Sequence, residues 1–144
     1  MRLKAAYLAD YAEVINGKLY VHGGLVTQVA KPMFPMPLDL SLVMVFEHTR
    51  QEQNTQHQLE IRPIDVDGEP FAPPFTAEIG IGTLAAGTPR GLPLHVPVAA
   101  RLGMPLPGPG TYAFAILLDT HDLESVQFLV HGPQAPPGGA PPQQ

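Results

Sequence analysis

The sequence contains no cysteine and no tryptophan, and only 8 of its 144 residues are lysine or arginine. Without cysteine the chain has no disulfide framework, no thiolate zinc site and no cysteine nucleophile. With 13 acidic residues and a formal charge of −5, it also lacks the basic surface that nucleic acids and anionic lipids require. We therefore expect no direct binding to nucleic acid or to a membrane.

Long hydrophobic segments are missing as well. The longest apolar run, residues 40–46 with Ser41 inside it, is far shorter than the roughly 18 residues that a membrane helix needs. The apolar run at the amino terminus is interrupted by Asp10 and Glu13 before it reaches the length of a signal peptide. These features predict a cytoplasmic protein.

Proline and glycine are abundant, with 18 and 14 residues, and they divide the chain into short segments. Within many segments apolar side chains recur at every second position, which is the period of a β-strand. The clearest case is residues 110–131, which predict a hairpin with a polar turn at residues 119–124. The residues that share a face are Tyr112, Phe114, Ile116 and Leu118 on the first limb and Val126, Phe128 and Val130 on the second.

Further strands are predicted upstream. Alternation or apolar runs indicate strands at residues 3–8, 19–21, 38–46, 75–81 and 92–98. Asn16-Gly17 predicts a two-residue turn because both residues tolerate positive φ. The run at residues 38–46 carries apolar side chains on both faces and should be central, whereas the prolines in residues 92–98 place that strand at an edge.

The links between these strands also carry predictions. The prolines in residues 32–37 indicate a crossing from one sheet to the other, and the polar residues 47–58 indicate a long exposed hairpin loop. The apolar parity changes at Pro63, which predicts a β-bulge near Arg62 and Pro63. Tyr112 follows Pro109-Gly110 at a strand entry, an arrangement similar to the tyrosine corner of Greek-key sandwiches.

About eight short strands with no helical periodicity predict an all-β protein, an antiparallel immunoglobulin-like or C2-like β-sandwich. We assign residues 1–131 to this domain. Residues 132–144 are rich in proline and glycine and have no aliphatic side chain larger than alanine, so we expect a disordered tail.

Two stretches of sequence carry a family resemblance. The opening YLADYAEVINGKLYVHGG, followed by PMFPMP, and the closing GTYAFAILLDTHDLESVQFLV resemble a family of small uncharacterised bacterial proteins. Residues 47–106 carry no matching motif. The resemblance implies a β-sandwich of unknown role, and it brings no catalytic residues.

Two acidic turns are candidate metal sites. Carboxylates from two loops at one end of a sandwich can bind Ca²⁺, which accepts six to eight oxygen ligands. Aspartate is also common in hairpin turns for local hydrogen bonding alone, and that reading needs no metal. The candidates are Asp119, His121, Asp122 and Glu124 in one turn and Asp65, Asp67 and Glu69 in the other.

Other side chains suggest sites only in part. Tyr7, Tyr11 and Tyr20 either line a binding face on the first hairpin or pack against neighbouring strands. His48 and His57 flank the polar loop and are able to approach each other, but the chain has no H-x-H or H-E-x-x-H motif.

Catalytic and cofactor motifs are likewise weak. Neither Ser41 nor Ser125 lies in a G-x-S-x-G motif, so a serine nucleophile is not indicated. Gly80, Gly82 and Ala85 match a dinucleotide-binding pattern, but no helix can follow them. We therefore expect no cofactor.

The sequence thus favours a non-enzymatic binding or assembly module. It would act through an exposed strand edge or through its end loops, with an unknown protein partner or by self-association. One alternative is a Ca²⁺-dependent module that uses the acidic turns. A second is a small enzyme with a pocket inside the sandwich.

Overall fold

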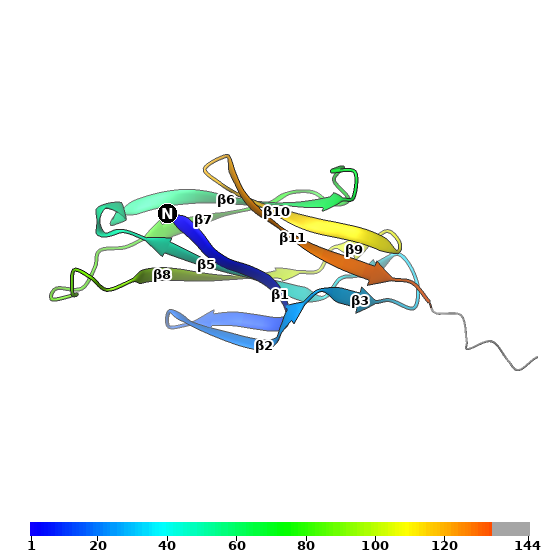
Figure 1. Ribbon diagram of the computed structural model, residues 1–144, viewed down its shortest axis with the longest axis horizontal. Coiled ribbons are helices and arrows are strands. Elements are labelled where there is room, and N and C mark those ends of the chain that lie inside the picture. Colours follow the sequence, from blue (N-terminus) through cyan, green and yellow to red (C-terminus); the bar gives the residue numbers. More distant parts are fainter. Residues whose placement is uncertain (134–144) are drawn as a thin grey trace, which may run out of the picture.

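Runs of alternating polarity become strands because each run can bury its apolar face against a second layer. A computed structural model describes residues 1–133 and shows two sheets packed face to face (Figure 1). Sheet A contains, in spatial order, β2 (Lys18–Val26), β1 (Arg2–Ile15), β5 (Leu40–His48) and β8 (Leu94–Leu102). Sheet B contains β3 (Gln28–Ala30), β11 (His121–His131), β10 (Gly110–Leu118), β6 (Thr55–Asp65) and β7 (Phe75–Ile81). The pairs are antiparallel except for β3 with β11, so the predicted β-sandwich is confirmed.

The main core lies between the sheets and uses the face that the sequence predicted for the closing hairpin. Phe114 is fully buried, and its ring stacks on that of Phe128 with the centroids 5.3 Å apart. Tyr112 lies beside Phe128, and its hydroxyl donates to the carbonyl oxygen of Gly108 at 2.8 Å. This bond forms the predicted tyrosine corner.

The turn between β10 and β11 is shorter than the predicted segment of residues 119–124. Only Asp119 and Thr120 lie between the strands, and both have positive φ, at 49° and 70°. Such a turn matches the twist of the flanking strands, so pairing resumes at His121. The polar residues that follow therefore belong to β11.

β5 is central, as predicted, with β1 on one side and β8 on the other. Leu42, Met44 and Phe46 belong to the main core and are fully buried. On the opposite face Ser41 and Val43 are equally buried. The outer face of sheet A must therefore be covered by another part of the chain.

The covering layer is the hairpin of residues 9–26. β1 pairs with β5 through its first half and with β2 through its second half, and both β1 and β2 contact β8. A register shift between Leu8 and Ala9 marks the change, as expected where a strand bends. In Figure 1 β2 lies below β5 and β8, because sheet A bends along β1. Ala9, Ala12 and Val43 fill a small second core beneath this hairpin.

The first hairpin is longer than predicted. β1 does not end near residue 8 but continues to Ile15, because its second half has the outer face of sheet A to cover. The Asn16-Gly17 turn is confirmed, with φ of 51° and 73°.

The predicted β-bulge near Arg62 and Pro63 is wrong, because β6 pairs with β10 without a register shift. Pro63 itself occupies the buried parity that follows Ile61. The Pro63 carbonyl oxygen accepts the N–H of Phe71, so the backbone groups of Pro63 face the side of β6 on which β7 lies. The β6–β7 ladder ends at the pair of Ile61 with Phe75, and no β7 residue pairs with Pro63. The missing proline N–H therefore costs no ladder bond.

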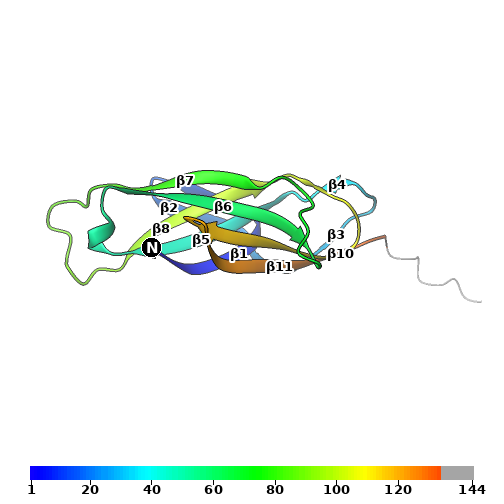
Figure 2. The same cartoon turned by 90° about the horizontal axis from the view of Figure 1, so that it is seen from above.

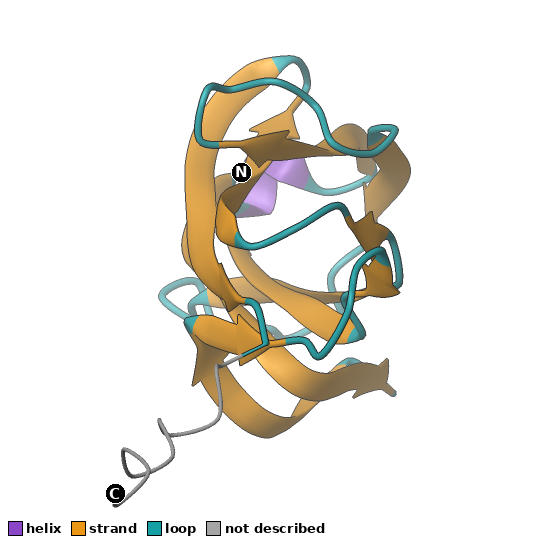
Figure 3. Ribbon diagram, turned by 90° about the vertical axis from the view of Figure 1, so that its right-hand side faces the viewer, coloured by secondary structure: helices purple, strands orange, loops and turns teal. Residues whose placement is uncertain are grey.

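The predicted hairpin loop at residues 47–58 is also wrong. β5 continues to His48 and β6 begins at Thr55, and these strands lie in different sheets. The link between them contains a 3-10 turn, η1 (Arg50–Glu52), which lies near the amino terminus in Figure 3. The terminal amino group forms an ion pair with Glu52. A polar stretch alone does not distinguish a hairpin loop from a link between sheets, because both are exposed.

The remaining connections follow the sequence more closely. β8 lies at an edge of sheet A with Pro97 inside it, as predicted. Residues 31–39 lead from β3 in sheet B to β5 in sheet A, which confirms the proline-rich crossing. β4 (Met36–Pro37) lies within this crossing and pairs with β9 (Pro105–Leu106), which lies between β8 and β10. A single residue, Thr27, separates β2 in sheet A from β3 in sheet B.

Most of the predicted tail, residues 134–144, lies outside the described residues. Among residues 1–133 there is no helix of the length and apolar character needed to cross a membrane.

Candidate functional site

The two acidic turns lie at opposite ends of the β6–β10 pair. Asp65 pairs with Tyr112 near the start of β10, whereas Asp119 follows the end of β10 and donates its N–H to the Gln58 carbonyl oxygen. Among residues 1–133, no three histidine or carboxylate side chains form a group that is able to hold a metal ion. The shared end that a two-loop Ca²⁺ module requires is not present.

The side chains of the β10–β11 turn bond within the chain. The Asp119 carboxylate accepts the Gln58 N–H at 2.8 Å and lies 2.6 Å from Nδ1 of His57. The Gln58 bond and, second, the His57 bond lower the pKa of Asp119 below its usual value. His121 Nδ1 lies 3.0 Å from the Asp119 carbonyl oxygen. These contacts are typical of an aspartate that holds a turn together.

The side chains of the other acidic candidates either form hydrogen bonds within their own turn or form none. One oxygen of Asp65 accepts the backbone N–H groups of Asp67 at 2.9 Å and Glu69 at 3.0 Å. The side chains of Asp122 and Glu124 are exposed on β11 and form no hydrogen bonds among the described residues. Among these candidates, the Asp65 and Asp119 carboxylates thus accept backbone N–H groups in or beside their turns.

The three candidate tyrosines do not share one face. Tyr7 packs into the small second core, against Gly24. Tyr11 and Tyr20 lie on the outer face of the first hairpin and are 44% and 45% exposed. The Tyr11 ring lies 5.7 Å from the guanidinium carbon of Arg101. Only two of the three tyrosines are thus available to a partner on that face.

The serine and histidine candidates have structural contacts. The Ser41 hydroxyl is fully buried and accepts the Ala12 N–H at 3.1 Å, with Arg101 at 3.3 Å. His48 contacts the carbonyl oxygen of the next residue and His57 contacts a carboxylate of the β10–β11 turn, so the two histidines have different partners.

The most open strand edge is that of β7, which follows the upper border of Figure 2 with β6 beside it. Gln58 directs its backbone N–H and C=O towards the β10 side, so its partner Glu78 directs its own groups away from β6. By strand alternation Thr76 and Gly80 do the same. Among residues 1–133 these outward groups have no backbone partner.

The side chains of β7 leave this edge lightly protected. Ile79 and Ile81 are buried in the core, whereas Phe75, on the same parity, remains 42% exposed. Glu78 is the one charged residue of the strand, and the strand contains no proline. Charged side chains, prolines and irregular backbone are the features that usually prevent an edge strand from pairing with another chain.

The other edges carry more of that protection. β8 contains Pro97, and β2 is irregular where Gly23 and Leu25 have positive φ. β3 has three residues, and the free part of β11 carries two carboxylates opposite a register shift.

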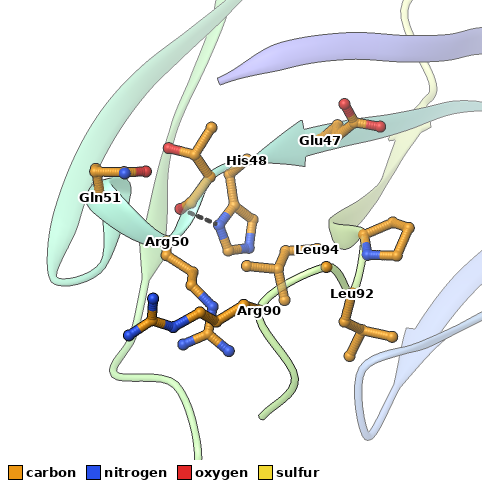
Figure 4. Close-up of a pocket in the computed structure, with 10 residues that line it drawn as sticks. Glu47, His48, Arg50, Gln51, Arg90, Leu92 and Leu94 are labelled. Atoms are coloured by element: carbon orange, nitrogen blue, oxygen red, sulfur yellow. Dashed lines mark hydrogen bonds between the residues drawn. The ribbon is translucent and has the colours of Figure 1, made fainter.

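A hollow at one end of the sandwich is the second candidate site (Figure 4). Its volume is about 680 Å³, and it is lined by residues 47–51 and 90–94. Arg50 and Arg90 both line the hollow, and their side chains are drawn in the same part of Figure 4, while Leu92 and Leu94 add apolar surface beside them. His48, only 9% exposed, also lines the hollow.

Glu47 lines the same hollow but points away from the arginines in Figure 4. Partial desolvation raises the pKa of Glu47, but the charges of Arg2 and Lys4 outweigh that effect and hold the pKa below its usual value. A carboxylate of lowered pKa is a weak base at neutral pH.

Sequence reasoning did not find this hollow, because its two arginines come from loops without a periodic pattern. The pair of His48 with Leu94, at the ends of β5 and β8, brings those loops together. Only a correct prediction of the β5–β8 pairing would have revealed them as neighbours.

Comparisons with known proteins add a family but no activity. No curated protein matches the chain in sequence. An alkylpurine DNA glycosylase of Pseudomonas fluorescens, solved with DNA containing an abasic-site analogue, is similar over 73% of this chain and 27% of that chain, with 13% identity and a TM-score of 0.44. A match with that identity and TM-score gives no information about the function of this chain. The model of a family of unknown function, DUF6941, matches residues 4–131, and the chain therefore belongs to that family.

Proposed function

We propose that the protein is a binding module that takes up an extended segment of a partner protein along β7. The observation that carries this proposal is the row of outward N–H and C=O groups at Thr76, Glu78 and Gly80. An added strand would satisfy these groups with ladder hydrogen bonds, which is the common basis of strand-addition recognition. In this proposal the protein acts by binding and catalyses no reaction.

The side chains of β7 define the chemistry of the partner. An apolar residue of the added strand would cover the exposed part of the Phe75 ring. A lysine or arginine on its other face would lie opposite Glu78, where cross-strand pairs of opposite charge are favourable. The partner segment is therefore extended, with alternating apolar and basic residues.

A second copy of this chain fits the edge less well. Antiparallel pairing of two β7 strands about their centre places the two Glu78 carboxylates opposite each other, and like charges in that position repel. The net charge of −5 adds to that repulsion.

Peptide selection on the full chain tests the proposal. A displayed library of extended peptides with alternating apolar and basic residues supplies the probes. Glu78→Pro removes one outward N–H and leaves the hydrogen-bonded pairs with β6 in place, whereas Glu78→Ala keeps the N–H and is the matched control. We expect selected peptides to lose at least about tenfold in affinity with Glu78→Pro, and less with Glu78→Ala.

Amide hydrogen exchange at residues 76, 78 and 80 should slow when such a peptide binds. Unchanged affinity with Glu78→Pro, or a selection that yields no peptide protecting these amides, contradicts the proposal. A dimer that Glu78→Pro dissociates would assign the edge to a second copy instead.

A further inference from the structure

The hollow of residues 47–51 and 90–94 contains two arginines without acidic partners. The other three arginines of the chain each form an ion pair with a carboxylate; the pairs are Arg2 with Glu47, Arg62 with Glu60 and Arg101 with Asp39. Within the part of the chain that the structure describes, neither Arg50 nor Arg90 has such a pair. The two unpaired arginines are the two that share this hollow.

The Arg50 side chain is fixed but not satisfied. One of its terminal nitrogens donates to the Thr88 carbonyl oxygen, which holds the guanidinium in place. Its Nε is buried and has no hydrogen-bond partner. Arg90 also lines the hollow, and its side chain makes no hydrogen bond with the other residues among 1–133. That Nε is covered by protein and cannot reach a ligand, but the second terminal nitrogen of Arg50 is neither hydrogen-bonded nor fully buried. This free donor, with a second arginine lining the same hollow, favours an anionic acceptor.

Glu47 does not neutralise this cluster. Its carboxylate points away from the two arginines in Figure 4 and lies 2.9 Å from Arg2 and 3.5 Å from Lys4. His95 lies 3.7 Å from the same carboxylate. The hollow is therefore a local positive site on a chain of net negative charge.

We propose that this hollow binds a phosphate monoester with an apolar substituent. Two guanidinium groups match the several oxygens and the charge of about −2 that a phosphate monoester carries near neutral pH. Leu92, which is 51% exposed, and Leu94 offer apolar surface beside the arginines, where a substituent would lie. The proposal does not rest on strand addition at β7.

Calorimetric titration of the full chain with phenyl phosphate and with inorganic phosphate tests this. We expect phenyl phosphate to bind, inorganic phosphate to bind several-fold more weakly, and phenol not to bind. Arg90→Gln should lower the affinity for phenyl phosphate at least tenfold, and because Arg90 is exposed and unbonded the fold should be retained. Arg62→Gln, on the exposed face of β6, should leave the affinity unchanged. Chemical-shift changes on binding should be confined to residues 47–51 and 90–94.

Equal affinity of wild type and Arg90→Gln, or no heat and no shift changes at millimolar phenyl phosphate, overturns the proposal. Equal affinity for the two phosphates would assign the site to free phosphate and remove the apolar substituent. Glu78→Pro should bind phenyl phosphate as wild type does, which separates this result from that of the β7 edge.

Discussion

Asp119 shows how one residue links local backbone geometry to the pH dependence of stability. It occupies a turn position with φ of 49°, where asparagine and aspartate are the best tolerated residues besides glycine. Its carboxylate accepts the Gln58 N–H and contacts His57, and the pKa of Asp119 is lowered by these bonds in that order. The pKa of Asp119 is therefore lower in the folded protein than in the unfolded chain. The ionised carboxylate stabilises the fold fully above the unfolded-state pKa, and this stabilisation is lost as the pH falls through the folded-state pKa.

Asp119→Asn should reduce this pH dependence. Asparagine keeps the turn conformation and an oxygen acceptor for Gln58 but cannot titrate. We expect a small change in melting temperature at pH 7 and a shallower fall in melting temperature between about pH 5 and pH 3 than in wild type. Asp122→Asn, which removes a carboxylate without hydrogen bonds in the same hairpin, is the control. A profile of Asp119→Asn that parallels wild type would contradict the assignment.

At the scale of residues, the features that local rules govern were predictable. The Asn16-Gly17 turn and the Tyr112 corner each depend on a few neighbouring residues, and both are confirmed. The position of Pro63 was not, because its tolerance in β6 depends on where a neighbouring strand begins.

At the scale of elements, Arg101 of β8 holds the covering hairpin on sheet A. Its guanidinium donates to the Asp10 carbonyl oxygen at 2.9 Å and to the Ser41 hydroxyl at 3.3 Å. It also pairs with Asp39 and lies over the Tyr11 ring. One side chain thus joins the second half of β1 to β5 and β8.

Arg101→Ala should loosen the hairpin of residues 9–26 more than the rest of the fold. We expect faster amide exchange in those residues, corresponding to a loss of roughly 1 kcal/mol in local opening free energy. Arg101→Lys keeps the charge near Asp39 but lacks the planar fork and should give an intermediate effect. Arg62→Ala is the control for the loss of an exposed arginine. Uniform exchange changes across both sheets would contradict this role.

Sequence periodicity predicted the strands but not the path between them. The alternation in residues 75–81 and 110–118 fixed which side chains face the core. The link at residues 49–54 crosses between sheets because β5 and β6 pair with different neighbours, and this depends on long-range contacts that no local pattern contains.

At the scale of the whole molecule, the stability depends on the aromatic centre of the core. Phe114 has no exposed surface and stacks on Phe128 at an interplanar angle of 11°. Both strands of the closing hairpin and both sheets meet there, so a change at this centre affects the global unfolding equilibrium.

Phe114→Ala should lower the free energy of unfolding by about 3–5 kcal/mol, because it removes a buried ring and leaves a cavity. Phe75→Ala, on the exposed edge of the same sheet, should cost about 1 kcal/mol or less. Urea unfolding followed by circular dichroism measures both variants. Similar losses for the two variants would contradict the position of the core.

The candidate sites were less accessible to sequence reasoning than the fold. The sequence correctly placed the proline-bearing residues 92–98 at an edge, but it did not indicate which strand forms the other, less protected edge. The openness of β7 depends on its being last in its sheet. The acidic turns were candidate metal sites because aspartate is common both in turns and among metal ligands. In the structure the carboxylates of Asp65 and Asp119 accept backbone N–H groups in or beside their turns.

The single residue Thr27 between β2 and β3 has a mechanical consequence. On that side a single residue joins the two sheets, whereas on the other side the much longer segment of residues 82–93 separates β7 from β8. Slow separation of the layers should therefore be a rotation about the Thr27 side, with the widest gap between β7 and β8. Amides in those two strands will then be the first of the sandwich to exchange with solvent, before any global unfolding.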